Sequence, residues 1–384
     1  MSILNHYLNG YVYQPVTMKV YPFEGIYPNP DLIPSPESFF GSVKHDYTEY
    51  YENGFFLHSK EKAYYILEIT TETKSHTGII ACLKVEDYSK GKIVKHEQTI
   101  ATSEQAMLKL ILLRGAMVKP VLLSHPEIKD LTKELKKLKK KRTPFSQFML
   151  SEGAIEYTLY QIPEKEGEHL AKIYNAHLPK VYIADGHHRC STSEKLLHLQ
   201  GDKNEFDYSM ILAALFSFDQ LDVLDYNRVV ELPYHLKLTR FIAELSHYFD
   251  IQILDGPAKP QLKHELTMVM QEDWFLLKWK PEVLSRYKKT STILDAHLLD
   301  KEIFEGILGV TNVLEDKRVS YISGIYGPQK IEEKVRESEH HVGFCIYPVQ
   351  FPEIVRVSDY HETLPPKSTW FEPRMINGLI VKSY

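Results

Sequence analysis

Short apolar runs alternate with polar and turn-forming segments along most of the chain. Runs rich in β-branched and aromatic residues, which are typical of strands, occur at 63–68, 77–85, 92–94 and 120–123. Apolar residues at helical spacing predict helices over 102–113, 131–138 and 236–249. We therefore expect an α+β fold of the mixed α/β type, in which mixed sheets are flanked by helices.

Prolines interrupt the first 60 residues and predict a different kind of structure there. The segments 27–30 and 33–36 each carry two prolines beside Asn or Ser, a composition that favours turns. We expect an irregular, wrapped segment in this part of the chain.

A strand is predicted to run directly into the most polar turn of the sequence. Residues 179–184 suit a buried strand, and they are followed by Asp185, Gly186, His187, His188 and Arg189. Ser191 and Glu194 then have the spacing of a capping box, so a helix is expected to start near Cys190. Glycine allows a ligand to approach closely, arginine offers a planar set of donors, and a helix start adds unpaired N–H groups. Together they predict an anion site, with phosphate as the expected anion.

Three further polar clusters supply candidate site residues. Lys95, His96 and Glu97 follow a predicted strand and combine a cation, an imidazole and a carboxylate, a set able to support general base catalysis. Asn227 and Arg228 provide an amide and a guanidinium that can hold a carboxylate or a ribose. Lys367, Ser368 and Thr369 lie in a proline-stiffened segment beside two aromatic residues, which suits contact with phosphate.

Each cluster also has a structural interpretation that the sequence leaves open. Polar turn residues often bond local backbone groups, and charged residues are common at exposed strand ends. A metal site at His187 and His188 is disfavoured, because adjacent residues on an extended backbone point in different directions and no third ligand is near. The lysine-rich face over 133–142 is interpreted as a solvated helix surface.

Length and charge limit the class of protein. The chain has 384 residues, 43% of them hydrophobic, so we expect an N-terminal α/β lobe over 1–150 and a C-terminal α/β lobe over 151–384. The second lobe would carry the turn at Asp185, with the site at the interface of the lobes. A formal net charge of -5 argues against nucleic acid as a partner. No P-loop, GxGxxG, GxSxG or HExxH pattern occurs.

Cysteine usage and hydropathy indicate the compartment. Cys82, Cys190 and Cys345 have no paired spacing, so neither a disulfide framework nor a zinc knuckle is predicted. The N-terminus lacks the apolar stretch of a leader, and no run of about eighteen apolar residues occurs. We expect a cytoplasmic protein without a membrane partner, and the sequence does not indicate an oligomeric state.

The motifs closely resemble those of domain-of-unknown-function family 1015. Residues 184–189 read ADGHHR and residues 365–373 read PPKSTWFEP, and these two segments carry most of the resemblance. Further similarity at 95–99, 225–229, 316–318 and 324–325 extends it over roughly 91–384. One departure is visible, because the early Pro-Pro-Tyr-Asp segment of the family is replaced here by PSPESFFG at 34–41.

The DGHHR segment is also similar to the phosphate-binding signature of the ParB and sulfiredoxin superfamily, which includes free-serine kinases that use ADP or ATP. The resemblance implies a nucleotide-binding core of that type. It implies phosphate contacts from Gly186, His187, His188 and Arg189. From the residue types of the clusters themselves, we also expect phosphate contacts from Ser191, Lys367, Ser368 and Thr369, and substrate contacts from Lys95, His96, Asn227 and Arg228. Glu97 or Asp185 would deprotonate the acceptor. Sulfiredoxin chemistry itself is not expected, because His187 stands where that reaction needs a cysteine.

These observations predict a nucleotide-dependent phosphotransferase that acts on a small hydroxyl compound, with free L-serine as the best single candidate. ATP or ADP would be the cofactor, accompanied by Mg²⁺. Two alternatives remain open: a nucleotide-binding regulatory module without turnover, and a nucleotide hydrolase or phosphatase.

Overall fold

The chain forms two compact units in the computed structural model, which describes residues 18–150, 154–199 and 206–384. The first unit comprises the described residues up to 94 together with those of 99–220 and 375–384, and the second comprises 95–98 and 221–374. The boundary expected at residue 150 falls inside the first unit. Hydrogen bonds between β8 (Ser146–Leu150) and β9 (Ile155–Pro163) join the chain on both sides of that position into one sheet.

Eight strands form the main sheet of the first unit, in the order β5, β10, β7, β11, β4, β3, β9, β8. The remaining bounds are β3 Ala63–Thr70, β4 Ser75–Lys84, β5 Ile93–Val94, β7 Val121–His125, β10 Val181–Asp185 and β11 Met210–Ser217. Two parallel pairs, β5 with β10 and β7 with β11, lie among antiparallel neighbours. The sheet is therefore mixed, and the predicted mixed α/β class is confirmed.

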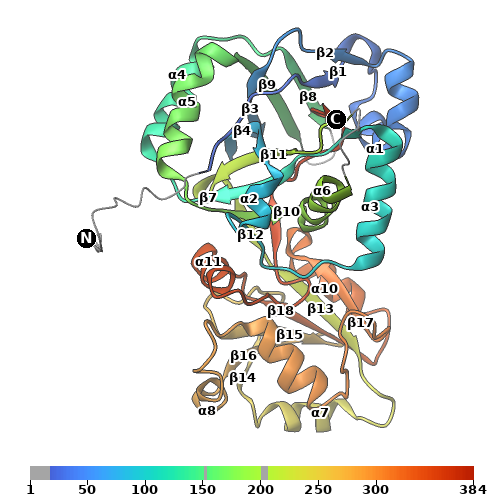
Figure 1. The fold of residues 1–384 in the computed structure, drawn as a ribbon. Helices are drawn as coiled ribbons and strands as arrows, with labels where there is room; N and C mark the ends of the chain where they lie inside the picture. The colour runs from blue at the N-terminus through green and yellow to red at the C-terminus, as the bar shows by residue number, and fades with distance from the viewer. Residues whose placement is uncertain (1–17, 151–153, 200–205) are drawn as a thin grey trace, which may run out of the picture. The chain divides into compact units, whose positions relative to one another are not determined.

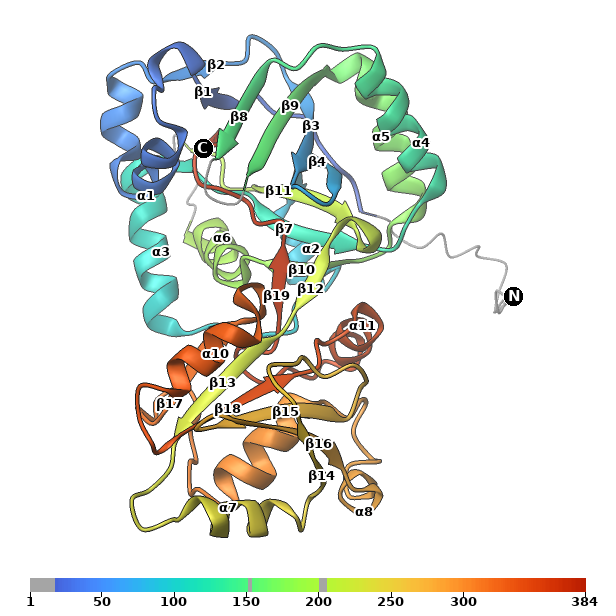
Figure 2. The ribbon, with the colours of Figure 1, turned by 180° about the vertical axis from the view of Figure 1, so that it is seen from behind.

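Helices cover both faces of this sheet (Figures 1 and 2). They are α1 Pro36–Glu52, α2 Val85–Ser89, α3 Ala101–Arg114, α4 Lys129–Lys140, α5 Glu164–His177 and α6 His187–Leu199. The pair α4 and α5 lies on one side, and α1, α3 and α6 lie on the other. Short strands β1 Ile26–Pro28, β2 Phe56–His58, β6 Ala116–Met117 and β20 Lys382–Ser383 form two small sheets. Because both faces are covered, central strand residues such as Leu67 and Leu122 are completely buried.

The expectation of an irregular segment over the first 60 residues is wrong for the residues that form α1. Ser35 accepts a hydrogen bond from the N–H of Ser38, and Pro36 occupies the first turn, where its fixed φ and missing N–H are tolerated. Phe39, Phe40, Val43 and Tyr47 are buried along one side of the helix. The last proline of the turn-forming series thus marks a helix start.

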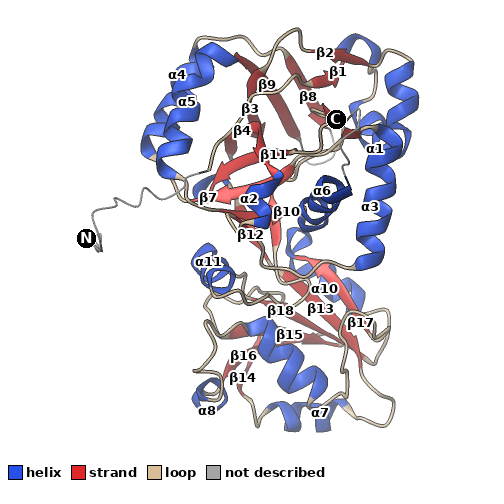
Figure 3. Cartoon of the chain, viewed as in Figure 1, coloured by secondary structure: helices blue, strands red, loops and turns tan. Residues whose placement is uncertain are grey.

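The second unit contains a six-stranded antiparallel sheet in the order β14, β16, β15, β18, β13, β17. Its strands are β13 Tyr226–Glu231, β14 Phe249–Leu254, β15 Glu265–Met270, β16 Asp273–Trp279, β17 Val319–Ser323 and β18 His341–Ile346. A separate ribbon pairs β12 (Asp222–Leu224) with β19 (Trp370–Glu372). Figure 3 shows these strands in red among the helices of the unit.

Two apolar clusters, built on different sets of strand residues, pack helices against this sheet. The larger includes residues of α7 (Leu238–Leu245), α8 (Pro281–Ser285), α9 (Asp295–Leu298) and the π-helical turn Leu299–Glu305. The smaller joins Val229, Val269 and Trp274 to Ile331 and Val335 of α10 (Gly327–Val335). The last helix is α11 (Phe351–Asp359). The second unit therefore has a core of its own.

Two sequence-based exclusions can be compared with the structure. Cys82, Cys190 and Cys345 are buried free thiols, in agreement with the absence of a disulfide framework. Within the described ranges, no helix combines the length and the apolar composition that crossing a membrane requires.

Candidate anion-binding site

The helix after β10 begins at His187, immediately beyond the strand. Gly186 has φ +110°, and its carbonyl accepts the N–H groups of Arg189 at 2.9 Å and Cys190 at 3.1 Å. The helix start predicted near Cys190 is therefore wrong, because the glycine turns the chain within one residue and Ser191 lies in the second turn. His187 and His188 therefore form the amino end of α6, which carries the partial positive charge of a helix start.

The Arg189 side chain folds back over this turn. A Cβ atom on Gly186 would lie 2.6 Å from Nη2 of Arg189, so only glycine allows the contact. Nη2 donates to Oδ2 of Asp185 at 2.9 Å, and Nζ of Lys119 lies 3.4 Å from the same oxygen. With 8% of its surface exposed, Arg189 is held in place rather than free in solvent. Asp185 thus positions two cations.

Arg189 and Lys119 line a pocket that also receives Lys44 and Arg114. We call this the Arg189 pocket. Its cavity volume is about 40 Å³, and apolar side chains of α3 and the segment after it, including Met107, Leu110, Ile111, Met117 and Val118, form a wall. No acidic side chain is among the described residues that line it. Four cations around one apolar-walled pocket favour a ligand with several negative charges.

The side chain of Ser191 is already hydrogen-bonded within the protein. Its hydroxyl donates to a carboxylate oxygen of Glu104 on α3, and Lys195 of α6 donates to the other oxygen. Hydrogen bonds from Lys195, Ser191 and Thr99 lower the pKa of Glu104 to about 2. These contacts fasten α3 to α6, so the structural interpretation of Ser191 accounts for its position, and its predicted phosphate contact stays a prediction.

The two histidines of the turn differ in exposure. His187 is buried, whereas His188 is half-buried. Burial lowers the pKa of the His188 imidazole below its usual value, which favours the neutral ring at neutral pH. Nδ1 of His188 is buried without a hydrogen-bond partner in the described part of the chain. An unsatisfied buried nitrogen is costly, so this atom marks a position where a ligand or a water molecule would be stabilised.

Lys95, His96 and Glu97 belong to the second unit. His96 is 1% exposed, and burial lowers its pKa to about 4. Its carbonyl accepts the N–H of Leu364 at 2.8 Å, and its ring lies 6.2 Å from that of Phe371. The structure therefore brings this cluster beside the predicted 365–373 segment, and a neutral buried imidazole is poorly suited to hold an anionic substrate by charge.

Asn227 and Arg228 are engaged inside the second unit. Oδ1 of Asn227 accepts the N–H of Ile346 at 3.0 Å. Arg228 is completely buried, with Nε 3.0 Å from Oδ1 of Asp300 and Nη1 donating to the carbonyl of Tyr226 at 3.1 Å. These contacts match the structural interpretation of the two residues. Their contact with substrate stays a prediction.

The predicted Lys367–Thr369 cluster forms a turn. The hydroxyl of Ser368 donates to the carbonyl of Pro365 at 2.6 Å, and Lys367 has φ +54°. Nζ of Lys367 lies 5.2 Å from the centre of the Tyr226 ring, which also contacts Trp370 edge-on at 5.4 Å. Lys367 is exposed, whereas Ser368 is buried and Thr369 is half-buried. Ser368 thus closes the turn, and the three phosphate contacts stay predictions.

The predicted site residues are therefore divided between the two units. Asp185 to Ser191 lie in the first, and the other eight lie in the second. Sequence reasoning missed Lys44, Arg114 and Lys119, because each is an isolated basic residue outside any motif. Only folding gathers them at Arg189.

The chain is similar to one protein family and to several solved structures. The family described as protein of unknown function (DUF1015) matches residues 26–300. No curated protein matches the chain. Among solved structures, similarity is found to a mutant of a free serine kinase in complex with ADP, with 14% identity, a TM-score of 0.37, and coverage of 78% of this chain and 92% of that one.

Two further solved structures are similar over the same share of this chain. A conserved hypothetical protein from Pyrococcus furiosus has 14% identity and a TM-score of 0.36, with 94% of that chain covered. SbnI with a C-terminal truncation, from Staphylococcus aureus, has 12% identity and a TM-score of 0.39, with 85% of that chain covered.

Proposed function

The chain belongs to the DUF1015 family of proteins of unknown function, and from this premise we propose that it binds a nucleotide in the Arg189 pocket and transfers a phosphoryl group to a small hydroxyl compound. ATP or ADP is the proposed donor, and free L-serine is the best candidate acceptor. Arg189 of the DGHHR segment lines this pocket, so the motif and the pocket point to the same place in the first unit.

The observation that carries the proposal is the set of four cations around one pocket. Lys44, Arg114, Lys119 and Arg189 line it, and Asp185, which is outside the lining, pairs with the last two. Arg189 lies in the first turn of α6, so the partial positive charge of that helix end lies beside the pocket. The cavity volume of about 40 Å³ suits a group of phosphate size, and the apolar side chains beside it would contact the rest of the nucleotide outside the cavity.

The chemistry that this arrangement supports is mainly neutralisation of charge. In the transfer step the acceptor oxygen bonds to the terminal phosphorus while the bond from that phosphorus to the bridging oxygen of the nucleotide breaks. The acceptor proton passes to a carboxylate, and the leaving nucleotide retains the electron pair. Lysine and arginine side chains stabilise the negative charge on the phosphoryl oxygens during this exchange.

Asp185 is better suited to hold Arg189 and Lys119 than to accept this proton. Its Oδ2 already contacts both cations, at 2.9 Å and 3.4 Å. We therefore retain Glu97 as the predicted base. This assignment rests on the sequence motif, since Glu97 and the Arg189 pocket belong to different units.

The described residues form no cluster that would hold the expected Mg²⁺ by protein ligands alone. No group of three or more His, Cys, Asp or Glu side chains that could hold a metal occurs among residues 18–150, 154–199 and 206–384. Magnesium at nucleotide sites is held largely by the phosphates and one or two carboxylates, so Asp185 is the available ligand next to the turn. Because Asp185 is already paired with two cations, we derive no step through the metal.

The test combines binding with product analysis. The full chain is titrated with ADP and ATP by calorimetry, then incubated with each nucleotide and a panel of hydroxyl amino acids, and phosphorylated products are sought by phosphorus NMR. Arg189→Ala is expected to weaken nucleotide binding about tenfold or more, since a charge-assisted hydrogen bond contributes roughly 1.5–3 kcal/mol. Arg240→Ala, an exposed arginine in the second unit, serves as the matched control.

The possible results separate the candidate functions. Product that depends on nucleotide and is lost in Arg189→Ala supports the kinase. Tight binding without product on any acceptor favours the regulatory module, and phosphate release without acceptor favours the hydrolase. Equal nucleotide affinity in Arg189→Ala and the unmodified protein would overturn the placement of the nucleotide.

A further inference from the structure

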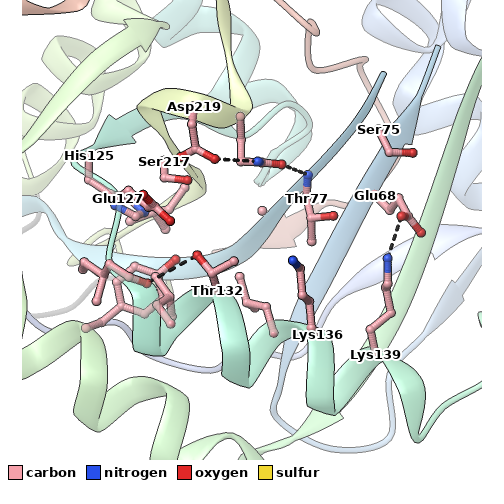
Figure 4. A pocket seen from close by; sticks show the side chains of 17 residues that line it. Glu68, Ser75, Thr77, His125, Glu127, Thr132, Lys136, Lys139, Ser217 and Asp219 are labelled. Carbon is pink, nitrogen blue, oxygen red and sulfur yellow. Dashed lines mark hydrogen bonds and ion pairs between the residues drawn. The ribbon is translucent and has the colours of Figure 1, made fainter. Parts of the chain in front are cut away.

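A second cavity in the first unit is lined by residues of β3, β4, α4, α5 and the end of β11 (Figure 4). We call it the α4 cavity. It shares no described lining residue with the Arg189 pocket. Its cavity volume is about 410 Å³, within the roughly 300–1,000 Å³ of small-molecule sites. Room for a small ligand is therefore present.

One part of the lining is a hydrogen-bonded acid. The Asp219 carboxylate accepts from Nε2 of Gln220 at 2.8 Å, and Oε1 of Gln220 accepts the N–H of Thr77 at 2.8 Å. Burial opposes ionisation, but hydrogen bonds from Ser217 and Gln220 outweigh it and lower the pKa of Asp219. Asp219 is therefore ionised at neutral pH, in a position fixed by the strand residue Thr77.

A lysine supplies the opposite charge. Figure 4 shows the Lys136 side chain extending from α4 towards Thr77, with Lys139 beside it. Lys139 is paired with Glu68 at 2.6 Å, so its charge is already compensated. In the part of the chain that the structure describes, Lys136 and Glu127 form no ion pair, whereas the charge of Lys74 also lowers the pKa of Asp219. The cavity thus presents an ammonium without an ion-pair partner together with two carboxylates.

Two buried rings complete the lining. His125 and Tyr174 are each 1% exposed and contact edge-on at 5.6 Å. Nδ1 of His125 lies 2.8 Å from the carbonyl of Pro126, which can only accept, so Nδ1 carries the proton and Nε2 is an acceptor. Burial lowers the pKa of His125 to about 4, so this acceptor persists at neutral pH. The cavity therefore offers a neutral acceptor in addition to its charges.

We propose that the α4 cavity binds a small zwitterion with the chemistry of a free amino acid, whose carboxylate faces Lys136 and whose ammonium faces Asp219 and Glu127. Hydroxyls of Ser75, Thr77, Thr132 and Ser217 line the same space and suit a polar ligand. A purely anionic ligand would meet the carboxylates of Asp219 and Glu127, and a purely cationic one would leave Lys136 without an anionic partner. The proposal concerns binding alone and does not depend on phosphoryl transfer.

The experiment is calorimetric titration of the full chain with the common amino acids, without nucleotide. At least one is expected to bind, and Lys136→Met and Asp219→Asn are each expected to weaken it about tenfold or more, as for loss of a charge-assisted hydrogen bond. Lys140→Met is the matched control, because Lys140 is an exposed lysine of the same helix outside the lining. Its affinity is expected to equal that of the unmodified protein.

Ligand analogues identify which charge meets which residue. The methyl ester of the bound amino acid lacks the carboxylate, so its affinity is expected to be insensitive to Lys136→Met. The N-acetyl derivative lacks the ammonium and is expected to be insensitive to Asp219→Asn. If Asp219→Asn does not fold, Glu127→Gln, at an exposed position, tests the acidic side and is expected to weaken binding as well.

Three results would overturn the proposal: no amino acid binds, Lys136→Met binds as tightly as the unmodified protein, or Arg189→Ala weakens amino-acid binding as much as Lys136→Met does. The third result would place the ligand in the Arg189 pocket. Conversely, loss of nucleotide binding in Arg189→Ala with unchanged amino-acid binding supports both proposals independently.

Discussion

Glu104 shows how the surroundings of a single carboxylate alter the pH dependence of stability. Lys195, Ser191 and Thr99 donate hydrogen bonds to it and lower its pKa from the ordinary 4.5 to about 2. Because the pKa in the folded state lies below that in the unfolded state, the ionised group stabilises the fold above about pH 4.5. This contribution decreases as the pH falls from that value towards 2.

We expect Glu104→Gln to lower the melting temperature at neutral pH, because the charge that holds α3 against α6 is lost. The difference from the unmodified protein should shrink as the pH falls to about 2, where the native carboxyl is protonated as well. Thermal unfolding followed by circular dichroism over this pH range checks it. Glu86→Gln, which removes a fully exposed acid paired with Lys90, should have little effect at any pH. A difference independent of pH would contradict the assignment.

At the scale of elements, the turn between β10 and α6 depends on one backbone conformation. Gly186 has φ +110°, a region that residues with a Cβ rarely adopt. The same residue leaves the space into which the Arg189 guanidinium folds. Strand end, helix start and arginine position are therefore coupled through a single glycine.

Gly186→Ala is expected to destabilise the protein by about 1–3 kcal/mol or more, as for a residue held in a sparsely populated conformation. Nucleotide binding should weaken as well, since the new Cβ displaces Arg189. Chemical denaturation and calorimetry measure the two effects. Gly41→Ala is the control, because nothing lies within 4 Å of its Cβ position in α1 and alanine favours the helix. Equal stability and affinity in Gly186→Ala would refute the coupling.

At the scale of the whole molecule, each unit has its own apolar core and the tryptophans report on only one of them. All three tryptophans, Trp274, Trp279 and Trp370, belong to the second unit. The Arg189 pocket and the α4 cavity are lined by residues of the first. Tryptophan fluorescence therefore reports on the second unit, whereas ligand binding at these two sites reports on the first.

Leu245→Ala, which removes a completely buried side chain of α7, is expected to cost about 2–5 kcal/mol in the second unit. The denaturant midpoint of tryptophan fluorescence should fall accordingly. Without denaturant, ADP affinity should stay unchanged, because the proposed nucleotide pocket belongs to the first unit. If Leu245→Ala kept native fluorescence but lost ADP binding, residues outside the Arg189 pocket would be needed to hold the nucleotide. Leu67→Ala, in the core of the first unit, provides the comparison.

Much of the first unit could be predicted from local patterns. The runs at 63–68 and 77–85 form β3 and β4, and Gly115 ends α3 with φ +58°, as expected. Thr102 does not cap that helix, whose N-cap is Ile100. The strand expected at 378–381 is instead represented by β20 at Lys382–Ser383. Interior segments were therefore easier to predict than element ends, which depend on packing as well as on local composition.

By itself, the sequence determined the mixed α/β class, the turn at Gly186 and the presence of an arginine beside it. These features follow from side-chain alternation and backbone freedom, which act over a few neighbouring residues. Tertiary structure decided which distant cations share the Arg189 pocket and which charges line the α4 cavity. Lys44, Lys119 and Arg189 meet there only because α1, the segment between β6 and β7, and α6 pack into one unit. Such contacts join residues that are far apart in the sequence, so local composition does not predict them.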